Sequence, residues 1–179
     1  MKSLIKSFGA VCIYLLLLTV NVNAQKSPKL TDPEIASVAV VANQVDINYA
    51  KIAKEKSKNA DVLKFAQTMS DDHNSVITQA VALVTKLHVT PKDNAVSKKL
   101  NSDAAKTGKM LRAKKGNAFN MAYINNEVSY HKAVIAAVEG LLIPQAQNAE
   151  LKKLLEDVMP TLRAHLEHAE MVQKMFKNK

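Results

Sequence analysis

Four long segments of this chain carry apolar residues at alternating three- and four-residue steps, and this rhythm constrains the fold more than any other feature. Such spacing gathers apolar side chains on one face of an α-helix, which must then be buried against other helices. The chain has 179 residues but only four Gly and five Pro. A sandwich or barrel of short strands needs turn residues much more often than that. The sequence therefore predicts one all-α domain.

The first two segments predict an antiparallel helical hairpin. Thr31 and Glu34 have the spacing of a capping box, so the first helix should begin here. It should end near Ser57, and Asn59 is a candidate N-cap for the second helix. The turn between the two helices is then very short, which is typical of helices that pack side by side.

A crossover follows this hairpin. Residues 89–116 break the apolar pattern, but so long a connection in a compact domain should contain structure of its own. We therefore predict a short lysine-rich helix over Ser102–Lys115. A long crossover lets the second and third long helices lie parallel, which is the connectivity of a ferritin-like four-helix bundle. We expect that architecture.

The third and fourth long helices should form a second hairpin. The third should begin near Asn117, with Gly140 and Pro144 marking its end. The fourth should begin near Asn148 and continue past Pro160. Proline removes one backbone hydrogen bond, so this helix should be bent at that position.

The N-terminus has the three parts of a cleavable export signal. Lys2 and Lys6 precede an apolar run over residues 10–20, and Ala24 ends a stretch with the small residues that signal peptidase recognises. A helix needs about 20 apolar residues to cross a membrane, so the run is too short for an anchor. We expect residues 1–24 to be removed.

Export determines the compartment and the chemistry of the mature chain. We expect a single domain of residues 25–179 in the periplasm or secreted, with outer-membrane association left open. The sole cysteine, Cys12, lies inside the signal, so the mature protein should have no thiol chemistry. No transmembrane segment is expected after cleavage.

The chain is basic, with a formal net charge of +9. Its densest basic cluster lies in the crossover and consists of Lys106, Lys109, Arg112, Lys114 and Lys115. This cluster either contacts anionic envelope polymers or lipid head groups, or is simply a solvated helix face. Nucleic acid is a poor partner, because the chain is exported and lacks aromatic residues interleaved with the basic ones.

Polar residues interrupt the apolar faces of the long helices near mid-length. They are Asp46 on the first helix, His73 on the second, Glu127 and His131 on the third, and His165 on the fourth. At a rise of about 1.5 Å per residue, these positions fall at similar heights in the bundle. The sequence therefore predicts one polar layer across the core.

Buried imidazole and carboxylate groups need partners, because burial without one costs several kcal/mol. Imidazole with carboxylate suits Zn, Cu, Fe or Mn, and bundles build such sites from inward-facing groups. The alternative is a closed, hydrogen-bonded layer that only fixes helix register. Ser70 and Leu162 replace the glutamates of the Glu-x-x-His pattern of di-iron sites, so a ferroxidase is not expected.

Three ordered motifs carry a family resemblance. They are Phe65-Ala66-Gln67 with Met69 and Asp71-Asp72-His73; Ala118-Phe119-Asn120 with Tyr123 and His131; and Met159-Pro160-Thr161-Leu162-Arg163 with His165. From Thr31 to Phe176 the chain resembles the bacterial domain of unknown function 4142, whose members are often labelled predicted outer membrane proteins. The resemblance implies an exported ferritin-like bundle. Asp46, Asn120 and Tyr130 depart from the residues usual in that family.

The sequence favours a noncatalytic binding protein. We expect this protein to be associated with the cell envelope or with stress, and to be able to hold a metal. No Ser-His-Asp or Cys-His arrangement and no glycine-rich phosphate loop is discernible. Two alternatives remain at this stage. The same layer could serve a metal-dependent redox or hydrolytic enzyme, or the basic crossover could make this an interaction protein.

Overall fold

The computed structural model describes residues 28–177, and the regular elements in that range are all helical. They are α1 (Asp32–Lys56), α2 (Ala60–Lys86), α3 (Ala95–Ala113), α4 (Gly116–Ala137), η1 (Val138–Leu142), α5 (Ile143–Gln145), α6 (Ala149–Asp157) and α7 (Met159–Lys177). The predicted all-α class is confirmed. The predicted export signal lies outside the described residues.

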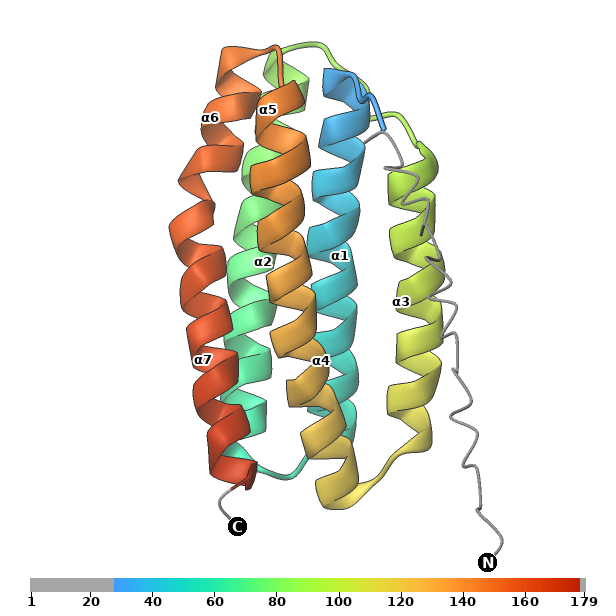
Figure 1. Cartoon of the computed structure of the whole chain (residues 1–179), viewed down its shortest axis with the longest axis vertical. Coiled ribbons are helices and arrows are strands. Elements are labelled where there is room, and N and C mark those ends of the chain that lie inside the picture. Colours follow the sequence, from blue (N-terminus) through green and yellow to red (C-terminus); the bar gives the residue numbers. More distant parts are fainter. Residues whose placement is uncertain (1–27, 178–179) are drawn as a thin grey trace, which may run out of the picture.

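Four rods pack side by side along the long axis (Figure 1). They are α1, α2, α4 continued by η1 and α5, and α6 continued by α7. α1 packs mainly against α2, α4 packs mainly against α7, and contacts of α1 with α4 and of α2 with α7 complete the bundle. α3 lies outside these rods beside α1 and returns the chain to the end where α2 began, so α2 and α4 run parallel (Figure 1).

Side-chain caps begin the first two helices where the sequence predicts. The backbone N–H of Thr31 donates to the Glu34 carboxylate at 2.9 Å. The side chain of Asn59 accepts from the backbone N–H of Val62 at 3.0 Å. Only residues 57–59 separate α1 from α2, and the predicted antiparallel hairpin is confirmed.

The crossover helix is longer than predicted. α3 begins at Ala95 rather than Ser102 and runs most of the length of the bundle, so the expectation of a short extra helix was wrong. Asn94 explains the early start, because its side-chain oxygen accepts from the backbone N–H groups of Val96 and Ser97 at 2.9 and 3.1 Å. Its amide nitrogen also donates to the carbonyl of Glu34 at 3.0 Å, which attaches the start of α3 to the start of α1.

The third long helix ends close to Pro144, one of the two residues predicted to mark its end, but it passes Gly140 through a π turn and continues to Gln145. Pro144 accounts for the π turn. In a regular α-helix its ring would collide with the carbonyl of residue 140. Within η1 the backbone N–H of Ile143 bonds instead to the carbonyl of Val138, and this wider turn accommodates the proline ring.

The fourth rod is bent as predicted. α6 begins after the N-cap Asn148 and ends at Asp157, and α7 begins at Met159, next to Pro160. Helical hydrogen bonding continues on both sides of the break, since the N–H of Val158 reaches the carbonyl of Leu154 at 3.2 Å. The rod is therefore one helix interrupted at the proline.

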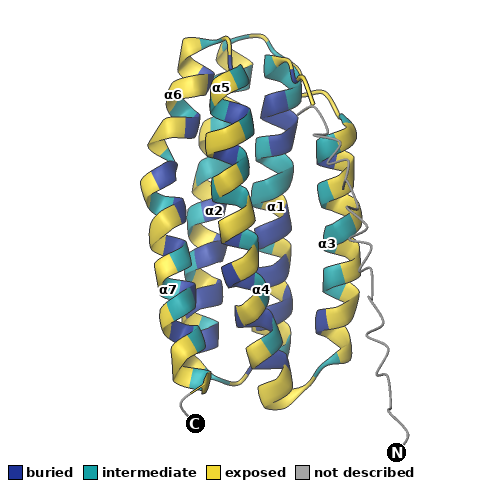
Figure 2. Ribbon diagram, viewed as in Figure 1, coloured by how far each residue is buried: buried dark blue, intermediate teal, exposed yellow. Residues whose placement is uncertain are grey.

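Buried residues are distributed along all four rods (Figure 2), and the buried apolar residues form two clusters. The upper cluster, near α6 in Figure 1, includes Leu30, Ile35, Val38, Val138, Leu142, Leu151, Leu155 and Leu162. The lower cluster includes Val45, Tyr49, Phe65, Met69, Phe119, Tyr123, Ile124 and Val172. Along each rod, the residues of the predicted polar layer fall between the positions of the two clusters or at their boundary.

The outer side of α3 is basic. Lys106, Lys109, Arg112 and Lys115 are exposed, and Lys114 is half-buried. Asp103 is paired with Lys99 at 2.5 Å and with Lys106 at 3.4 Å. Within residues 28–177, no helix combines the length and apolar character needed to cross a membrane.

Candidate metal centre

The five residues of the predicted polar layer lie together at mid-height in the bundle. Each of the four rods contributes at least one of them, and none is more than 4% exposed. They are Asp46 from α1, His73 from α2, Glu127 and His131 from α4, and His165 from α7. We call these five residues the polar layer.

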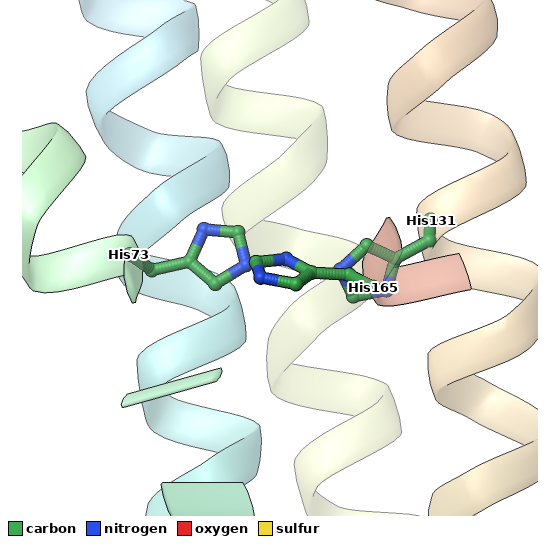
Figure 3. A group of neighbouring side chains, drawn as sticks. All are labelled: His73, His131 and His165. Carbon is green, nitrogen blue, oxygen red and sulfur yellow. The ribbon is translucent and has the colours of Figure 1, made fainter. Parts of the chain in front are cut away.

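The three imidazoles converge on one another from three rods (Figure 3). The ring centroids of His73 and His165 are 5.1 Å apart, and those of His131 and His165 are 5.4 Å apart. Each ring has one nitrogen atom that lies within 4.8 Å of a nitrogen atom in each of the other two rings. The three rings thus direct nitrogen atoms toward a common point.

The orientation of His73 is set by an asparagine on α1. Its Nδ1 lies 2.7 Å from Oδ1 of Asn43. The amide nitrogen of Asn43 donates to the carbonyl of Ala39 at 2.8 Å, so the amide oxygen is the atom that faces the imidazole. An amide oxygen only accepts, and Nδ1 of His73 therefore carries a hydrogen.

The other two imidazoles are also held by acceptors. Nδ1 of His131 lies 3.0 Å from the backbone carbonyl of Glu127, one helical turn earlier. Nε2 of His165 lies 2.8 Å from the carboxylate of Asp72 on α2. Neither oxygen can donate, so both nitrogen atoms carry hydrogens.

The remaining nitrogen of each ring faces the interior as a lone pair, because a neutral imidazole has one N–H and one acceptor nitrogen. These atoms are Nε2 of His73, Nε2 of His131 and Nδ1 of His165. All three are buried, and none has a hydrogen-bond partner in the described part of the chain. Histidines that bind metals have this arrangement, with the outer N–H donated to an oxygen and the inner nitrogen free for the ion.

Two carboxylates adjoin the imidazoles. Oδ2 of Asp46 lies 2.9 Å from Nε2 of His73 and 3.3 Å from Nε2 of His131. Both oxygen atoms of Asp46 lack a partner with hydrogen-bond alignment, as do both oxygen atoms of Glu127. Asp46, Glu127 and His131 form a second group whose ligand atoms lie within 4.8 Å of one another. His131 belongs to both groups.

The layer holds its carboxylates in different protonation states. Burial raises the pKa of Asp46, but the imidazoles of His73 and His131 outweigh burial and hold that pKa below its usual value. Burial, together with the negative charge of Asp46, raises the pKa of Glu127 well above its usual value. One carboxylate is therefore ionised at neutral pH, while the other favours its protonated form.

Burial also favours the neutral forms of His131 and His165. It lowers the pKa of His131, and the attraction of Asp46 offsets only part of that effect. The pKa of His165 is lowered for the same reason, against the opposing hydrogen bond from Asp72. Neutral imidazole is the form that binds a metal ion, so the donor set fits a transition metal without further change in these two rings.

Asn43 and Asp72 are site residues that the apolar pattern did not predict. Asn43 lies three residues before Asp46 on α1, which places both side chains on one face. Asp72 directly precedes His73, and its side chain is 44% exposed. The spacing of Asn43 is a usable signal, whereas Asp72 resembles any surface acid.

The fold and the site together define a helical bundle with a buried His/carboxylate cluster. The family model described as Domain of unknown function (DUF4142) matches residues 18–172. The chain belongs to this family, and the resemblance seen in its motifs is confirmed. No curated protein and no solved structure matches the chain significantly. The family description states no activity, so function has to be argued from the site.

Proposed function

We propose that this protein is an exported binding protein that holds a transition-metal ion in its polar layer. His73, His131 and His165 would supply nitrogen ligands, and Asp46 a carboxylate oxygen, with Glu127 adjacent. The donor set suits Zn, Cu, Fe or Mn. The observation that carries the proposal is the set of three buried imidazoles, each with its outer nitrogen donating and its inner nitrogen without a partner.

A closed structural layer is less consistent with this geometry. Such a layer would give each inner nitrogen a donor, because an unpaired buried polar atom costs about 1–3 kcal/mol. Oδ2 of Asp46 lies 2.9 Å from Nε2 of His73 and 3.3 Å from Nε2 of His131, but within residues 28–177 none of the three inner nitrogen atoms and neither oxygen of Asp46 has a partner with hydrogen-bond alignment. A cation at their centre would satisfy nitrogen lone pairs and carboxylate together.

The proposed architecture is a ferritin-like four-helix bundle. It is supported by two helical hairpins, a long crossover and the parallel course of α2 and α4. The ligand set differs from that of carboxylate-bridged di-iron bundles, because Ser70 and Leu162 stand where the paired glutamates would be. We therefore propose metal binding and not ferroxidase activity.

The proposed location is the periplasm or the exterior of a bacterial cell. It is supported by the charged, apolar and small-residue parts of residues 1–24, which have the order of an export signal. Association with the outer membrane is compatible with the proposal.

Metal analysis of the mature protein, purified without a histidine tag, tests the proposal. After reconstitution with Zn, Cu, Mn or Fe salts, we expect one stoichiometric ion per chain and a higher melting temperature. His73→Ala should abolish both effects. His88→Asn is the matched control, since His88 is exposed and has a φ of 53°, which asparagine tolerates.

The opposite result would identify a structural layer. If reconstituted wild-type protein binds no metal, and His73→Ala is only destabilised by about 1–3 kcal/mol, the residues serve to fix helix register. Equal metal loss in His73→Ala and His88→Asn would point to nonspecific binding.

A second proposed function rests on α3. This helix lies outside the four rods and exposes Lys106, Lys109 and Arg112 of the predicted basic cluster, while the link to α4 holds the half-buried Lys114 and the exposed Lys115. We propose that Lys106, Lys109, Arg112, Lys114 and Lys115 contact anionic groups of envelope polymers or lipid head groups. Attraction between exposed charges is screened over about 8 Å at physiological salt, so such binding should weaken as salt increases.

Charge-matched variants test this surface. Replacing the five cluster residues by Gln should abolish retention on an anionic polymer while leaving the thermal melt nearly unchanged. The control replaces five exposed lysines elsewhere, namely Lys51, Lys58, Lys64, Lys152 and Lys174. Equal retention of the two variants would show that net charge, and not α3, determines binding.

A further inference from the structure

A cavity of about 360 Å³ adjoins the polar layer, and its wall includes His73, His131 and His165. The next cavity in the described part of the chain is about 110 Å³ and lies away from the layer. A volume of about 360 Å³ falls near the lower end of the range for small-molecule sites, about 300–1,000 Å³. The inner nitrogen atoms of these imidazoles are thus next to a space large enough for a ligand.

Most of the cavity wall is apolar. Side chains from five α-helices and η1 contribute, among them Val38, Val76, Leu100, Val134, Val138 and Leu162. Two polar groups of the wall are already paired. Asn43 is bonded to His73, and the Tyr130 hydroxyl donates to the carbonyl of Ala42 at 2.8 Å. The wall therefore favours a hydrocarbon body over a polar one.

One further polar atom of the wall is unsatisfied. The amide nitrogen of Asn126, next to Glu127 on α4, is buried and has no hydrogen-bond partner in the described residues. The Asn126 side chain lies beside the Glu127 carboxyl and acts to lower the pKa of that group, but its amide nitrogen has no partner with hydrogen-bond alignment in the described residues and can donate to a ligand oxygen. A metal ion in the layer also binds oxygen lone pairs. A carboxylate can serve both groups.

The cavity has an entrance between α3 and α4. Ser129 and Ala133 of α4 line it and are exposed, while Val96 and Thr107 of α3 line it and are half-buried. α3 packs mainly against α1, and α4 packs mainly against α7. A flexible chain could therefore enter alongside α4 without opening the four-rod core.

We infer that this cavity binds a small aliphatic monocarboxylate, with its hydrocarbon chain along the apolar wall and its carboxylate at the metal ion and the Asn126 amide. The inference rests on the proposed metal site. Without the ion, the ligand would bring a second negative charge next to Asp46 in a buried, weakly polar region, which is unfavourable. Binding should therefore depend on metal.

Calorimetric titration with octanoate tests the inference. We expect octanoate to bind Zn²⁺-loaded protein and not metal-free protein. Ala137→Leu fills part of the cavity and should weaken octanoate binding about tenfold or more, with Zn²⁺ stoichiometry unchanged. Ala136→Leu is the matched control, because Ala136 is the exposed neighbour on the same helix and does not line the cavity.

A second cavity-filling variant, Ala39→Leu on α1, keeps the test decisive if Ala137→Leu fails to fold. Zn²⁺ binding without octanoate binding would overturn the inference and leave the proposed function standing. Equal octanoate affinity of Ala137→Leu and Ala136→Leu would also overturn it. So would binding of octylamine to the metal-free protein, which would assign the cavity to a cation. Absence of Zn²⁺ binding would remove the proposed function and the inference together.

Discussion

Each imidazole of the polar layer is oriented by a residue or carbonyl outside the ligand set, and these outer contacts determine which nitrogen faces inward. The contact between His165 and Asp72 is the most accessible of them, because Asp72 is partly exposed and can be changed without opening the core. Outer partners of this kind fix the tautomer and the direction of a ligating ring.

We predict that Asp72→Asn lowers metal affinity about 10- to 100-fold, because the asparagine side chain holds the His165 ring less well in its metal-binding tautomer. Competition with a chelating dye measures the change. Asp71→Asn is the control, since Asp71 is exposed and, among the described residues, accepts a hydrogen bond only from Gln67, at 2.8 Å. Equal affinities in the two variants would show that Asp72 does not support the site.

Two tyrosines near the layer, the half-buried Tyr130 and the buried Tyr123, allow a second test with the same substitution. The Tyr130 hydroxyl donates to the carbonyl of Ala42, whereas the Tyr123 hydroxyl is buried without a partner. Tyr130→Phe should lower the free energy of unfolding by about 0.5–1.5 kcal/mol. Tyr123→Phe should leave it unchanged or raise it, because an unsatisfied polar atom is removed. Urea denaturation measures both, and a larger loss in Tyr123→Phe would contradict the pairing described here.

The polar layer could be predicted from the sequence because a polar residue on an apolar helix face is conspicuous. His73, His131 and His165 each interrupt such a face, and the structure buries all three. The cavity and the pairing of each ring nitrogen could not be predicted. They depend on which faces of different helices meet, and helical spacing within one helix contains no information on that.

Helix starts were predicted accurately where a capping residue directly precedes an apolar face. Asn59 and Asn148 are such residues. The start of α3 was placed too late, because its face towards the bundle is narrow and the cap Asn94 follows a stretch without apolar rhythm. The π turn of η1 was missed because its cause, Pro144, was interpreted as part of the helix end. Local signals thus define helix termini better than irregularities within helices.

The start of α1 should be sensitive to acid. The pKa of Glu34 is lowered because its carboxylate accepts hydrogen bonds from the backbone N–H and the hydroxyl of Thr31. A carboxyl group with a lowered pKa in the folded state stabilises the protein above its unfolded pKa, about 4.3. This contribution is lost as the pH falls through the folded value.

We therefore predict that Glu34→Gln is less stable than wild type at pH 7, and that the difference disappears as the pH is lowered below the pKa of Glu34. Urea midpoints measured from about pH 7 to pH 3 test this. A stability difference that stays constant over this range would show that the charge of Glu34 does not support the cap.

At the scale of the whole molecule, the predicted export signal implies where the mature protein should begin. We predict that a Gram-negative host produces a mature chain that begins at Gln25, because Ala24 ends the signal with a small residue. Intact-mass measurement of periplasmic material tests this. Ala24→Arg should block cleavage and serves as the control. Exported wild-type protein that retains residues 1–24 would contradict the prediction.

The upper and lower apolar clusters are distinct groups of buried residues, and the polar layer lies where they meet. Because the ligand set draws on all four rods, an ion would stay bound only while both halves of the bundle are closed. Local opening of either half would separate at least two ligands. The residence time of the ion would then be limited by the half that opens more often. A chelator that is added in excess and captures the released ion quickly would thus measure how often the bundle opens locally.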